Sequence, residues 1–395
     1  MDVSIAPETH PHHALKMTQE EPLDFLLLGP AATYRGGIAD TQHALAKSLT
    51  DMGYKVKLFT FTQLYPALLF PGKTQFTEET ENHSLSIERK VHAYNPFQWK
   101  HVAKTINQLQ PKAVVFRYWT PFLAPCWNSI AKRLNPSIKK VGWVDNWQAH
   151  EPKPWDRFLT QRFEKSMDLF TALSTTVAKE IKGDSQKRVW GKMHPIEANL
   201  PKKLDQKEAR KKLNFPEDKT ALLFFGLIRP YKGLAILIEA LKYHPEKHLF
   251  IVGECYEKWG SYQQLIERYQ LEKQITVVNR FVSYKEAAIY FSAVDATILP
   301  YTSATQSGVV ALAYHYETPL VVTDHPGLLE AVLSDKTGYI CLPEINGIKE
   351  AITVVTDAAE NKTFRENLKQ TKANYSWEVY AKEWANFILH EARKH

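Results

Sequence analysis

Two cations stand three residues apart in the segment GLIRPYKG, and their charge and spacing suit a phosphate-containing ligand. Arg229 and Lys232 follow the apolar stretch ALLFF and precede the helical pattern LAILIEAL, and Pro230 favours an extended backbone at Arg229. A helix N-terminus presents unpaired N–H groups and a partial positive charge, which attract an anion. Arg and Lys add charge-assisted hydrogen bonds. The segment therefore predicts a diphosphate site, with a solvated loop carrying two ordinary surface cations as the alternative.

Two further segments repeat this strand–turn–helix arrangement. In LDFLLLGPAATYRGGIADTQHALAKSL, Gly36 and Gly37 precede an amphipathic helix pattern, and adjacent glycines let a ligand approach the backbone closely. In SATQSG, Gln306, Ser307 and Gly308 begin the helix pattern VVALAYHY, where they offer a second set of donors to an anion. A tight turn and an ordinary Ser N-cap are the alternatives. The pattern G-x-G-x-x-G of dinucleotide-binding turns is absent, which argues against a dehydrogenase.

The loop VDNWQAHEPKPW gathers ionisable side chains directly after an apolar strand pattern. Asp145, Asn146, His150 and Glu151 lie within seven residues, and loops held by a rigid scaffold often carry catalytic groups. His150 and Asp145 are therefore the candidates for catalytic or substrate-orienting roles. A surface or capping histidine is the alternative for His150.

These segments need a scaffold that places strand ends side by side, and the remaining pattern supplies one. Strand-like and helix-like stretches alternate almost throughout, which indicates an α/β fold of doubly wound parallel sheets. Strands are expected at residues 23–29, 54–61, 113–119, 139–146, 169–175, 221–226, 248–253, 275–281, 296–301, 319–324 and 338–342.

The chain is long enough, at 395 residues, for two domains. Two prolines in HPIEANLP, residues 194–201, interrupt the helical pattern and indicate the boundary. The predicted division is a loose tail at 1–21, a first Rossmann-like domain at 22–195, a second at 196–372 and a C-terminal helix at 373–395 that could pack on either domain.

Composition excludes several classes of protein. No apolar run reaches the roughly 20 residues that span a bilayer, and no signal-peptide pattern stands at the N-terminus. Cys126, Cys255 and Cys341 are far apart and form neither a disulfide framework nor a metal pattern, so reduced thiols and a cytoplasmic location are expected. The net charge of +7 comes largely from clusters at 100–104, 132–140, 179–192 and 202–212. One explanation of these clusters is solvated surface lysines. The other is attraction to an acidic substrate or to the anionic inner face of a membrane. No nucleic-acid-binding module accompanies the clusters.

The motifs together resemble a known family. FFGLIRPYKGLAILIEAL and PYTSATQSGVVALAYHYETPLVVTD resemble the donor-binding domain of family 4 (group 1) glycosyltransferases of GT-B fold, in a bacterial branch with the SATQSG motif. FRYWTPFLAP, VDNWQAHE and YPALLFPGKTQF are similar to that branch, and the resemblance covers residues 23–390. It implies two Rossmann-like domains that face each other across a cleft holding a nucleotide-sugar.

The resemblance also implies residue roles. Arg229 and Lys232 would hold the diphosphate, while Gly36 and Gly37 would line the cleft near the phosphates and the transferred sugar. The SATQSG residues Gln306, Ser307 and Gly308 would donate to the distal phosphate. The loop around His150 would lie near the sugar and the acceptor.

Four positions depart from the family pattern. Many members carry two glutamates, one at the second position of the SATQSG motif and one eight residues later, that touch the donor sugar and the ribose. Here these positions are Ala304 and Leu312, and Glu317 replaces a glycine. The histidine common after the fourth first-domain strand is Asp145 here, with His150 five residues on. The departures affect the sugar and ribose contacts more than the diphosphate site.

The expected function is therefore transfer of a sugar from a nucleoside diphosphate sugar to an acceptor hydroxyl, on a glycan or a lipid-linked saccharide in polysaccharide biosynthesis. The resemblance implies that the anomeric configuration is retained. The sequence contains no D-x-D tract, so neither a metal nor another cofactor is expected. A nucleotide-sugar-binding protein without transfer activity and a GT-B epimerase or phosphorylase remain as alternatives.

Overall fold

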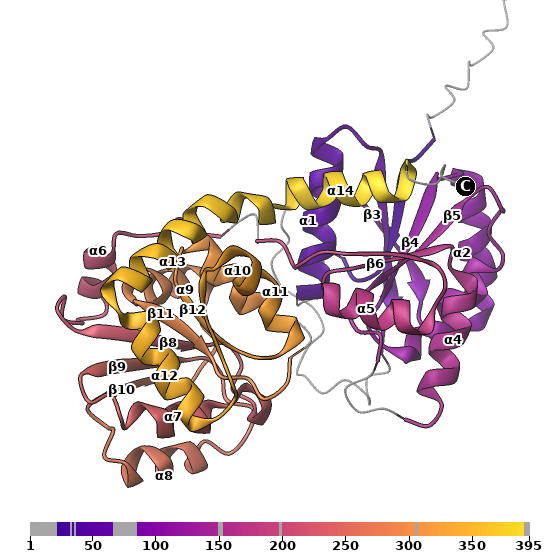
Figure 1. Cartoon of the computed structure of the whole chain (residues 1–395). Coiled ribbons are helices and arrows are strands. Elements are labelled where there is room, and N and C mark those ends of the chain that lie inside the picture. Colours follow the sequence, from indigo (N-terminus) through magenta and orange to yellow (C-terminus); the bar gives the residue numbers. More distant parts are fainter. Residues whose placement is uncertain are drawn as a thin grey trace, which may run out of the picture.

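The computed structural model describes residues 22–31, 34, 37–65, 85–148, 153–196, 200–304 and 307–390. These residues form two α/β domains, and the chain passes between the domains twice (Figure 1). Each domain is a parallel sheet covered by helices, as the alternating pattern predicts.

The first domain contains a seven-stranded parallel sheet with the order β3-β2-β1-β4-β5-β6-β7. The strands are β1 (Phe25–Leu28), β2 (Val56–Gln63), β3 (Ser86–His92), β4 (Ala113–Tyr118), β5 (Lys139–Val144), β6 (Leu169–Ala172) and β7 (Arg188–Gly191). The order reverses between β1 and β4, and a ligand crevice is expected at the carboxyl ends of the strands at such a point.

The second domain contains a six-stranded sheet with the order β10-β9-β8-β11-β12-β13. The strands are β8 (Thr220–Phe225), β9 (Lys247–Val252), β10 (Ile275–Val278), β11 (Ala296–Leu299), β12 (Leu320–Thr323) and β13 (Gly338–Cys341). Its order reverses between β8 and β11, so the turns after these two strands meet at one crevice. The segments GLIRPYKG and SATQSG are those two turns.

Helices connect the strands and cover the sheets. Those of the first domain are α1 (Gly37–Asp51), α2 (Pro96–Leu109), η2 (Pro121–Leu123), α3 (Ala124–Ala131), α4 (Asp156–Ser166) and α5 (Thr175–Asp184). The following ones are α6 (Gln206–Lys212), η3 (Pro230–Lys232), α7 (Leu234–Leu241), α8 (Gly260–Arg268), α9 (Tyr284–Ala293), α10 (Gly308–His315), α11 (Pro326–Asp335), α12 (Ile345–Thr356), α13 (Ala358–Thr371), η4 (Lys372–Tyr375) and α14 (Trp377–Leu389). No helix in the described ranges is long and apolar enough to cross a bilayer.

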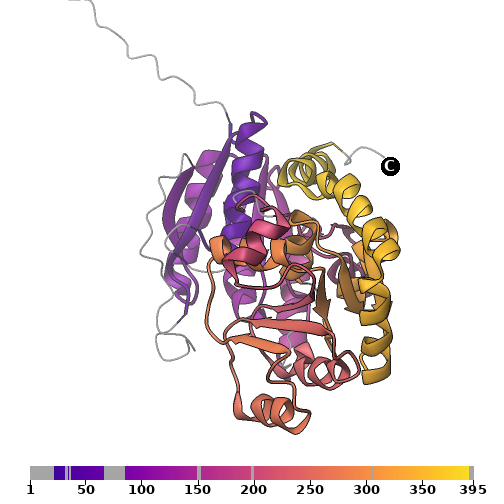
Figure 2. The ribbon, with the colours of Figure 1, turned by 90° about the vertical axis from the view of Figure 1, so that its left-hand side faces the viewer.

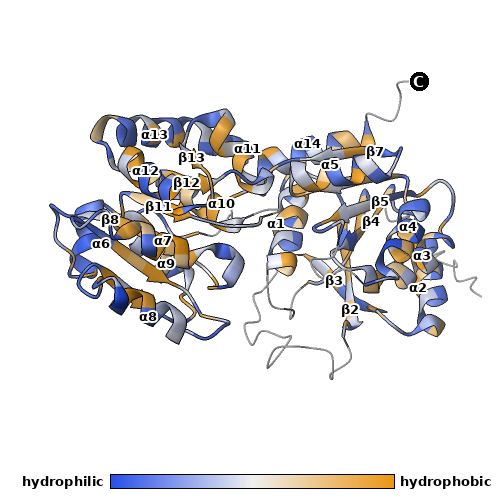
Figure 3. Cartoon of the chain, turned by 60° about the horizontal axis from the view of Figure 1, so that its bottom comes forward, coloured by the Kyte–Doolittle hydropathy of each residue, from blue (hydrophilic) through white to orange (hydrophobic). Residues whose placement is uncertain are grey.

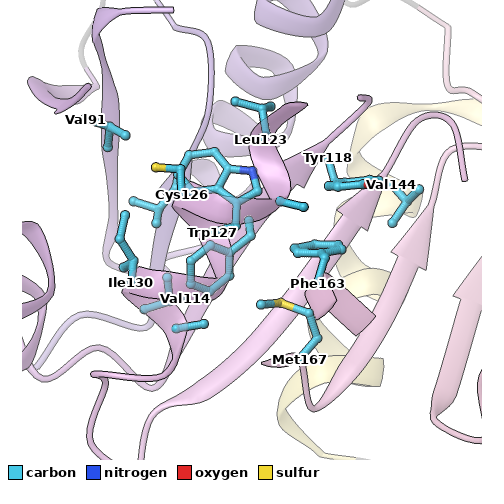
Figure 4. Close-up of a cluster of buried hydrophobic side chains, with 14 of the residues drawn as sticks. Val91, Val114, Tyr118, Leu123, Cys126, Trp127, Ile130, Val144, Phe163 and Met167 are labelled. Carbon is cyan, nitrogen blue, oxygen red and sulfur yellow. The ribbon is translucent and has the colours of Figure 1, made fainter. Parts of the chain in front are cut away.

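The strands are apolar on both faces because each sheet is covered on both sides. In β1, Leu26 and Leu28 join the core beneath α2, α3, α4 and α5, whereas Phe25 and Leu27 join the core beneath α1 and α14. Figure 4 shows the first of these cores around Trp127 of α3. Apolar residues gather in the same way on the strands of the second sheet and the inner faces of its helices (Figure 3).

The last helix packs on the first domain, which settles a question that the sequence left open. Helix α14 follows α13 and η4 and returns across the molecule to lie beside α1 (Figures 1 and 2). Trp384 lies 5.2 Å from Phe25 and 6.2 Å from Trp143 between ring centroids, and its Nε1 donates to Thr171 Oγ1 at 3.0 Å. The first domain is thus completed by residues from the end of the chain.

Two strands of the first sheet are absent from the sequence prediction. Strand β3, SIERKVH, carries three charged residues, and β7 is only four residues long. Both are edge strands, for which burial on two faces is not required. The remaining strands lie within the predicted stretches or within two residues of them.

Candidate functional site: an anion-binding cavity between the domains

A cavity of about 320 Å³ lies where the two domains meet. Gly37 at the start of α1 lines it from the first domain, and His194 lines it from the connection between the domains. The second domain contributes Lys232, Tyr301, Ser307 and Gly308. None of the described residues that line the cavity is acidic. Four residues that the sequence singled out for ligand binding therefore meet at one place: Gly37, Lys232, Ser307 and Gly308.

Lys232 is the cation in the wall of this cavity. Its side chain belongs to a residue that is only 8% exposed, and no described carboxylate forms an ion pair with it. Its Nζ lies 5.2 Å from the centroid of the Tyr301 ring, a cation–π contact that compensates only part of the lost hydration. Burial lowers the pKa of the Lys232 ammonium, and Arg229 lowers it further. A buried cation without an anionic partner, facing a cavity, is suited to an anionic ligand.

The backbone around Gly233 places Lys232 in this position. Gly233 has φ 69°, in the left-handed region, and a Cβ there would lie 1.9 Å from the carbonyl oxygen of Pro300. Only glycine permits both the conformation and the close packing of η3 against the end of β11. The turn after β8 therefore lies directly against Tyr301, the residue two positions beyond β11.

Arg229 takes a different place from Lys232. Its backbone is extended, with φ −140° and ψ 156°, which confirms the effect expected of Pro230. The side chain is exposed, and its guanidinium carbon lies 5.4 Å from the centroid of the Tyr256 ring. Arg229 is not among the residues that line the cavity. Its role at the diphosphate stays a prediction.

Two helices begin at the cavity, one from each domain. Ser307 is the N-cap residue of α10 with no side-chain cap hydrogen bond, and its Oγ lies 3.5 Å from the hydroxyl of Tyr301. Among the described residues outside the glycine's own helix and its chain neighbours, no atom lies within 4 Å of a Cβ built at Gly308 or Gly37, so the space above both is open. The N-termini of α10 and α1 thus add partial positive charge to that of Lys232. Gly36 and Gln306 lie outside the described residues.

Asp145 is buried in the first domain and forms an ion pair. Arg117 Nε donates to Asp145 Oδ2 at 2.7 Å, and Arg117 Nη2 donates to Oδ1 at 2.5 Å. Arg117 also donates to Thr41 Oγ1 of α1 at 3.0 Å and stacks 3.6 Å from the centroid of the Trp143 ring. Asp145 does not line the cavity. Its contacts indicate that it holds Arg117, and through Arg117 the first turns of α1; the catalytic role that the sequence suggested stays a prediction. His150 and Glu151 lie outside the described residues.

His194 is a cavity residue that the sequence reasoning missed. Its Nδ1 lies 2.7 Å from the carbonyl oxygen of Pro195, to which it donates, and its ring meets that of Trp377 edge-on at 6.0 Å. Burial lowers the pKa of His194 more than the hydrogen bond to Pro195 raises it, so the imidazole is neutral at pH 7. Its position in the predicted connection, residues 194–201, could have indicated this role, because a polar side chain between two facing domains lies beside their cleft.

The family departures are visible in the cavity wall. Leu312, one of the two positions where the resembled family pattern has a glutamate, lines the cavity with an apolar side chain. Ala304 packs against the core of the second domain. The cavity therefore offers the Lys232 cation and two helix N-termini to a ligand, but no carboxylate from these two positions.

A larger cavity, of about 520 Å³, lies at the opposite edge of the second sheet. Its two arginines are already bonded within the protein, and five acidic side chains also line it. Arg210 pairs with Asp295, and Arg365 donates to the backbone oxygens of Val294, Asp295 and Glu317. This cavity therefore gives no comparable indication of an anionic ligand.

Comparison with solved structures defines the fold. Sucrose-phosphate synthase from Thermosynechococcus elongatus superposes with a TM-score of 0.72 at 17% identity, covering 92% of this chain and 98% of that one. The Anabaena protein HepE, solved in complex with UDP, gives a TM-score of 0.72 at 17% identity, covering 92% and 99%. The fold is that of the GT-B glycosyltransferases, as expected from the sequence.

Sequence comparison points to one family within that class. Residues 205–374 match the model of the glycosyl transferases group 1 family. Glycogen synthase of Mycobacterium tuberculosis is 30% identical over 179 residues, a match that spans 42% of this chain and 42% of that protein. Both matches support a group 1 glycosyltransferase, and the first covers nearly the whole second domain. The narrower assignment to family 4 and to the SATQSG branch stays a prediction.

Proposed function

We propose that the protein transfers a sugar from a nucleoside diphosphate sugar to a hydroxyl of a glycan or a lipid-linked saccharide, with retention of the anomeric configuration. The single observation that carries this proposal is Lys232, a buried cation without a described anionic partner in the cavity between two helix N-termini. The donor's diphosphate supplies the missing negative charge. The group 1 match of the same domain supports the assignment.

The reaction needs little from the protein beyond positioning and charge stabilisation. The bond from the sugar's anomeric carbon to the diphosphate oxygen breaks, and a bond from the same carbon to the acceptor oxygen forms on the same face. The acceptor proton passes to the departing diphosphate. Lys232 and the N-termini of α10 and α1 stabilise the charge that develops on that diphosphate, so we propose that no metal ion takes part.

A binding protein without transfer activity is the second candidate, because Leu312 and Ala304 leave the cavity without the carboxylates of relatives. Incubating the protein with nucleotide-sugar and a panel of saccharide acceptors separates the two. Transfer or slow donor hydrolysis supports the enzyme, whereas binding with neither supports the second candidate. Conversion of the sugar without an acceptor, or transfer that depends on free phosphate, would indicate an epimerase or a phosphorylase.

The donor base is found by thermal unfolding with UDP, GDP, ADP and dTDP, since a ligand of the folded state raises the melting temperature. UDP and ADP come first, because HepE was solved with UDP and starch synthase IV of Arabidopsis thaliana with ADP and acarbose. If no nucleotide or nucleotide-sugar raises the melting temperature, the proposed function is wrong.

A further inference from the structure

Exposed aromatic side chains gather at the carboxyl edge of the first sheet. Phe97, in the first turn of α2, is 92% exposed, and Trp155 and Phe158, at the start of α4, are each 57% exposed. Tyr94 and Trp155 line one groove of about 410 Å³, together with Phe122. We call Tyr94, Phe97, Trp155 and Phe158 the aromatic surface. Large apolar groups at such exposure, gathered at one edge, indicate an interaction site.

The helices that carry the aromatic surface are strongly basic. Between Glu88 and Asp145 the sequence contains no Asp or Glu, and α4 adds only Asp156 and Glu164, both half-buried. Glu164 is engaged with Ser185 and Lys187. The cations on and beside α2, α3 and α4 are all exposed: Lys100, Lys104, Lys132, Arg133, Lys153, Arg157, Arg162 and Lys165.

Two of these cations lie directly on the aromatic rings. Lys153 Nζ is 5.9 Å from the centroid of the Trp155 ring, and the guanidinium carbon of Arg162 is 5.3 Å from that of Phe158. Cations thus lie beside the exposed rings of Trp155 and Phe158 at the start of α4. This is the composition of a protein face that sits at the boundary between lipid headgroups and acyl chains, where apolar rings enter and cations contact phosphates.

We propose that the protein binds peripherally to an anionic lipid bilayer through the aromatic surface and the surrounding cations of α2, α3 and α4. Phe97, Trp155 and Phe158 enter the headgroup region, and the cations contact lipid phosphates. A saccharide ligand could stack on the rings of the groove, but it would not account for the exposure of Phe97 or for the positive charge of α2, α3 and α4. The absence of exposed acids on these helices favours an anionic partner of large area.

The place of this surface suits a reaction at the membrane. The groove is lined by residues that follow β3 and β4, and Gly37 follows β1, so both the groove and the cavity lie at the carboxyl edge of one parallel sheet. Docking here turns this edge of the sheet, where Gly37 lines the cavity, towards the lipid headgroups. The use of a lipid-linked acceptor rests on the proposed function; the docking itself does not.

Vesicle flotation with the full chain tests the docking. Vesicles of phosphatidylcholine alone are compared with equimolar phosphatidylcholine and phosphatidylglycerol, at low and high salt. We expect binding to the anionic vesicles only, and weaker binding at high salt because ions screen the cations. The double variant Phe97→Ser/Phe158→Ser and the double variant Arg157→Glu/Arg162→Glu should each lower vesicle partitioning by about tenfold or more.

Matched controls come from the second domain. Tyr243→Ser removes another exposed aromatic and Lys369→Glu reverses another exposed cation, and both should leave partitioning unchanged. Equal binding to both vesicle types, or loss of binding in the controls as well, overturns the proposal. If the aromatic variants raise KM for a soluble saccharide and no vesicle binds, the surface is a sugar site instead. Nucleotide binding is measured on the same samples, so failure to dock and failure of the proposed transferase are seen separately.

Discussion

Replacing Lys232 with methionine should have two opposite effects, one on the ligand-free protein and one on nucleotide binding. Methionine has a similar length and no charge. Burial holds the pKa of Lys232 in the folded protein below its value in the unfolded chain. Protonated Lys232 therefore lowers the free energy of unfolding at every pH below the folded pKa, and this destabilisation disappears only above the unfolded pKa. Lys232→Met removes this destabilisation, and the ligand-free variant should melt at a higher temperature than the wild type.

Nucleotide binding should change in the other direction. A hydrogen bond to a charged group contributes about 1.5–3 kcal/mol, and each 1.4 kcal/mol is about tenfold in Kd. At a nucleotide concentration of about 100 times the wild-type Kd, the ligand stabilises the wild type by about 2.7 kcal/mol. A variant with about tenfold weaker binding keeps only about half of this. Since about 1 kcal/mol moves the melting temperature by about 2–4 °C in a domain of this size, the difference is measurable.

The assay is thermal unfolding of wild type and Lys232→Met, each with and without the nucleotide that binds best. Lys369→Met serves as control, because Lys369 is exposed on α13 and does not line the cavity between the domains. Its melting temperature and its response to nucleotide should match those of the wild type. A ligand-free Lys232→Met variant that melts lower than the wild type, or a variant that responds to nucleotide as fully as the wild type, refutes the assignment of Lys232 as the buried diphosphate contact.

Four further outcomes follow from the site. Arg229→Ala should weaken nucleotide binding less than Lys232→Met, since Arg229 is exposed outside the cavity wall; titration calorimetry that gives equal losses would contradict this. EDTA should leave transfer within about twofold of the untreated rate, because cations and helix dipoles supply the electrostatics; loss of activity restored by magnesium or manganese would count against it. Acid should destabilise the fold partly through His194, because burial holds its pKa below the unfolded value and the unfolded chain binds more protons as pH falls; urea unfolding of His194→Gln from pH 7 to 5 should show a flatter dependence, and an unchanged slope argues otherwise. His150→Ala should lower turnover by about tenfold or more and Asp145→Asn by less, both with little change in donor affinity; the reverse order would transfer the catalytic role to Asp145.

The sequence predicts the fold well because both sheets are buried on two faces. The central strands are near-continuous apolar runs, as in ALLFF, and such runs are distinct from the amphipathic helices between them. The missed strand β3 has no such run, since SIERKVH pairs only with β2 and leaves much of its surface in solvent. The residues on which α14 packs could not be predicted from the sequence either. Its apolar face required burial, but nothing local to it specified that Phe25 and Trp143 of the other domain would provide that burial.

The sequence predicts the site only in part. The turn that holds Lys232 could be predicted, because β8, Gly233 and α7 follow one another directly in the sequence. Spacing alone could not show that Lys232 is buried while Arg229, three residues earlier, is exposed. The pairing of Asp145 with Arg117 joins two strands, and the cavity position of His194 depends on how two domains face each other. Both depend on tertiary contacts, which no short stretch of sequence specifies.

The distribution of charge explains why the family departures can be tolerated. The second domain supplies the cation, the α10 N-terminus and the Tyr301 ring, all of which lie in or beside the two turns at its switch point. Leu312 is in the same wall, but a carboxylate there would repel a diphosphate as well as contact a sugar. Its loss therefore leaves the anion site intact and changes only what can recognise the sugar. The first domain adds a helix N-terminus whose position is held by Arg117 through Thr41, and Arg117 is in turn held by Asp145. Under the proposed function, sugar and acceptor selection then comes from the first domain and from Tyr and His side chains such as His194, which donate and accept without adding negative charge.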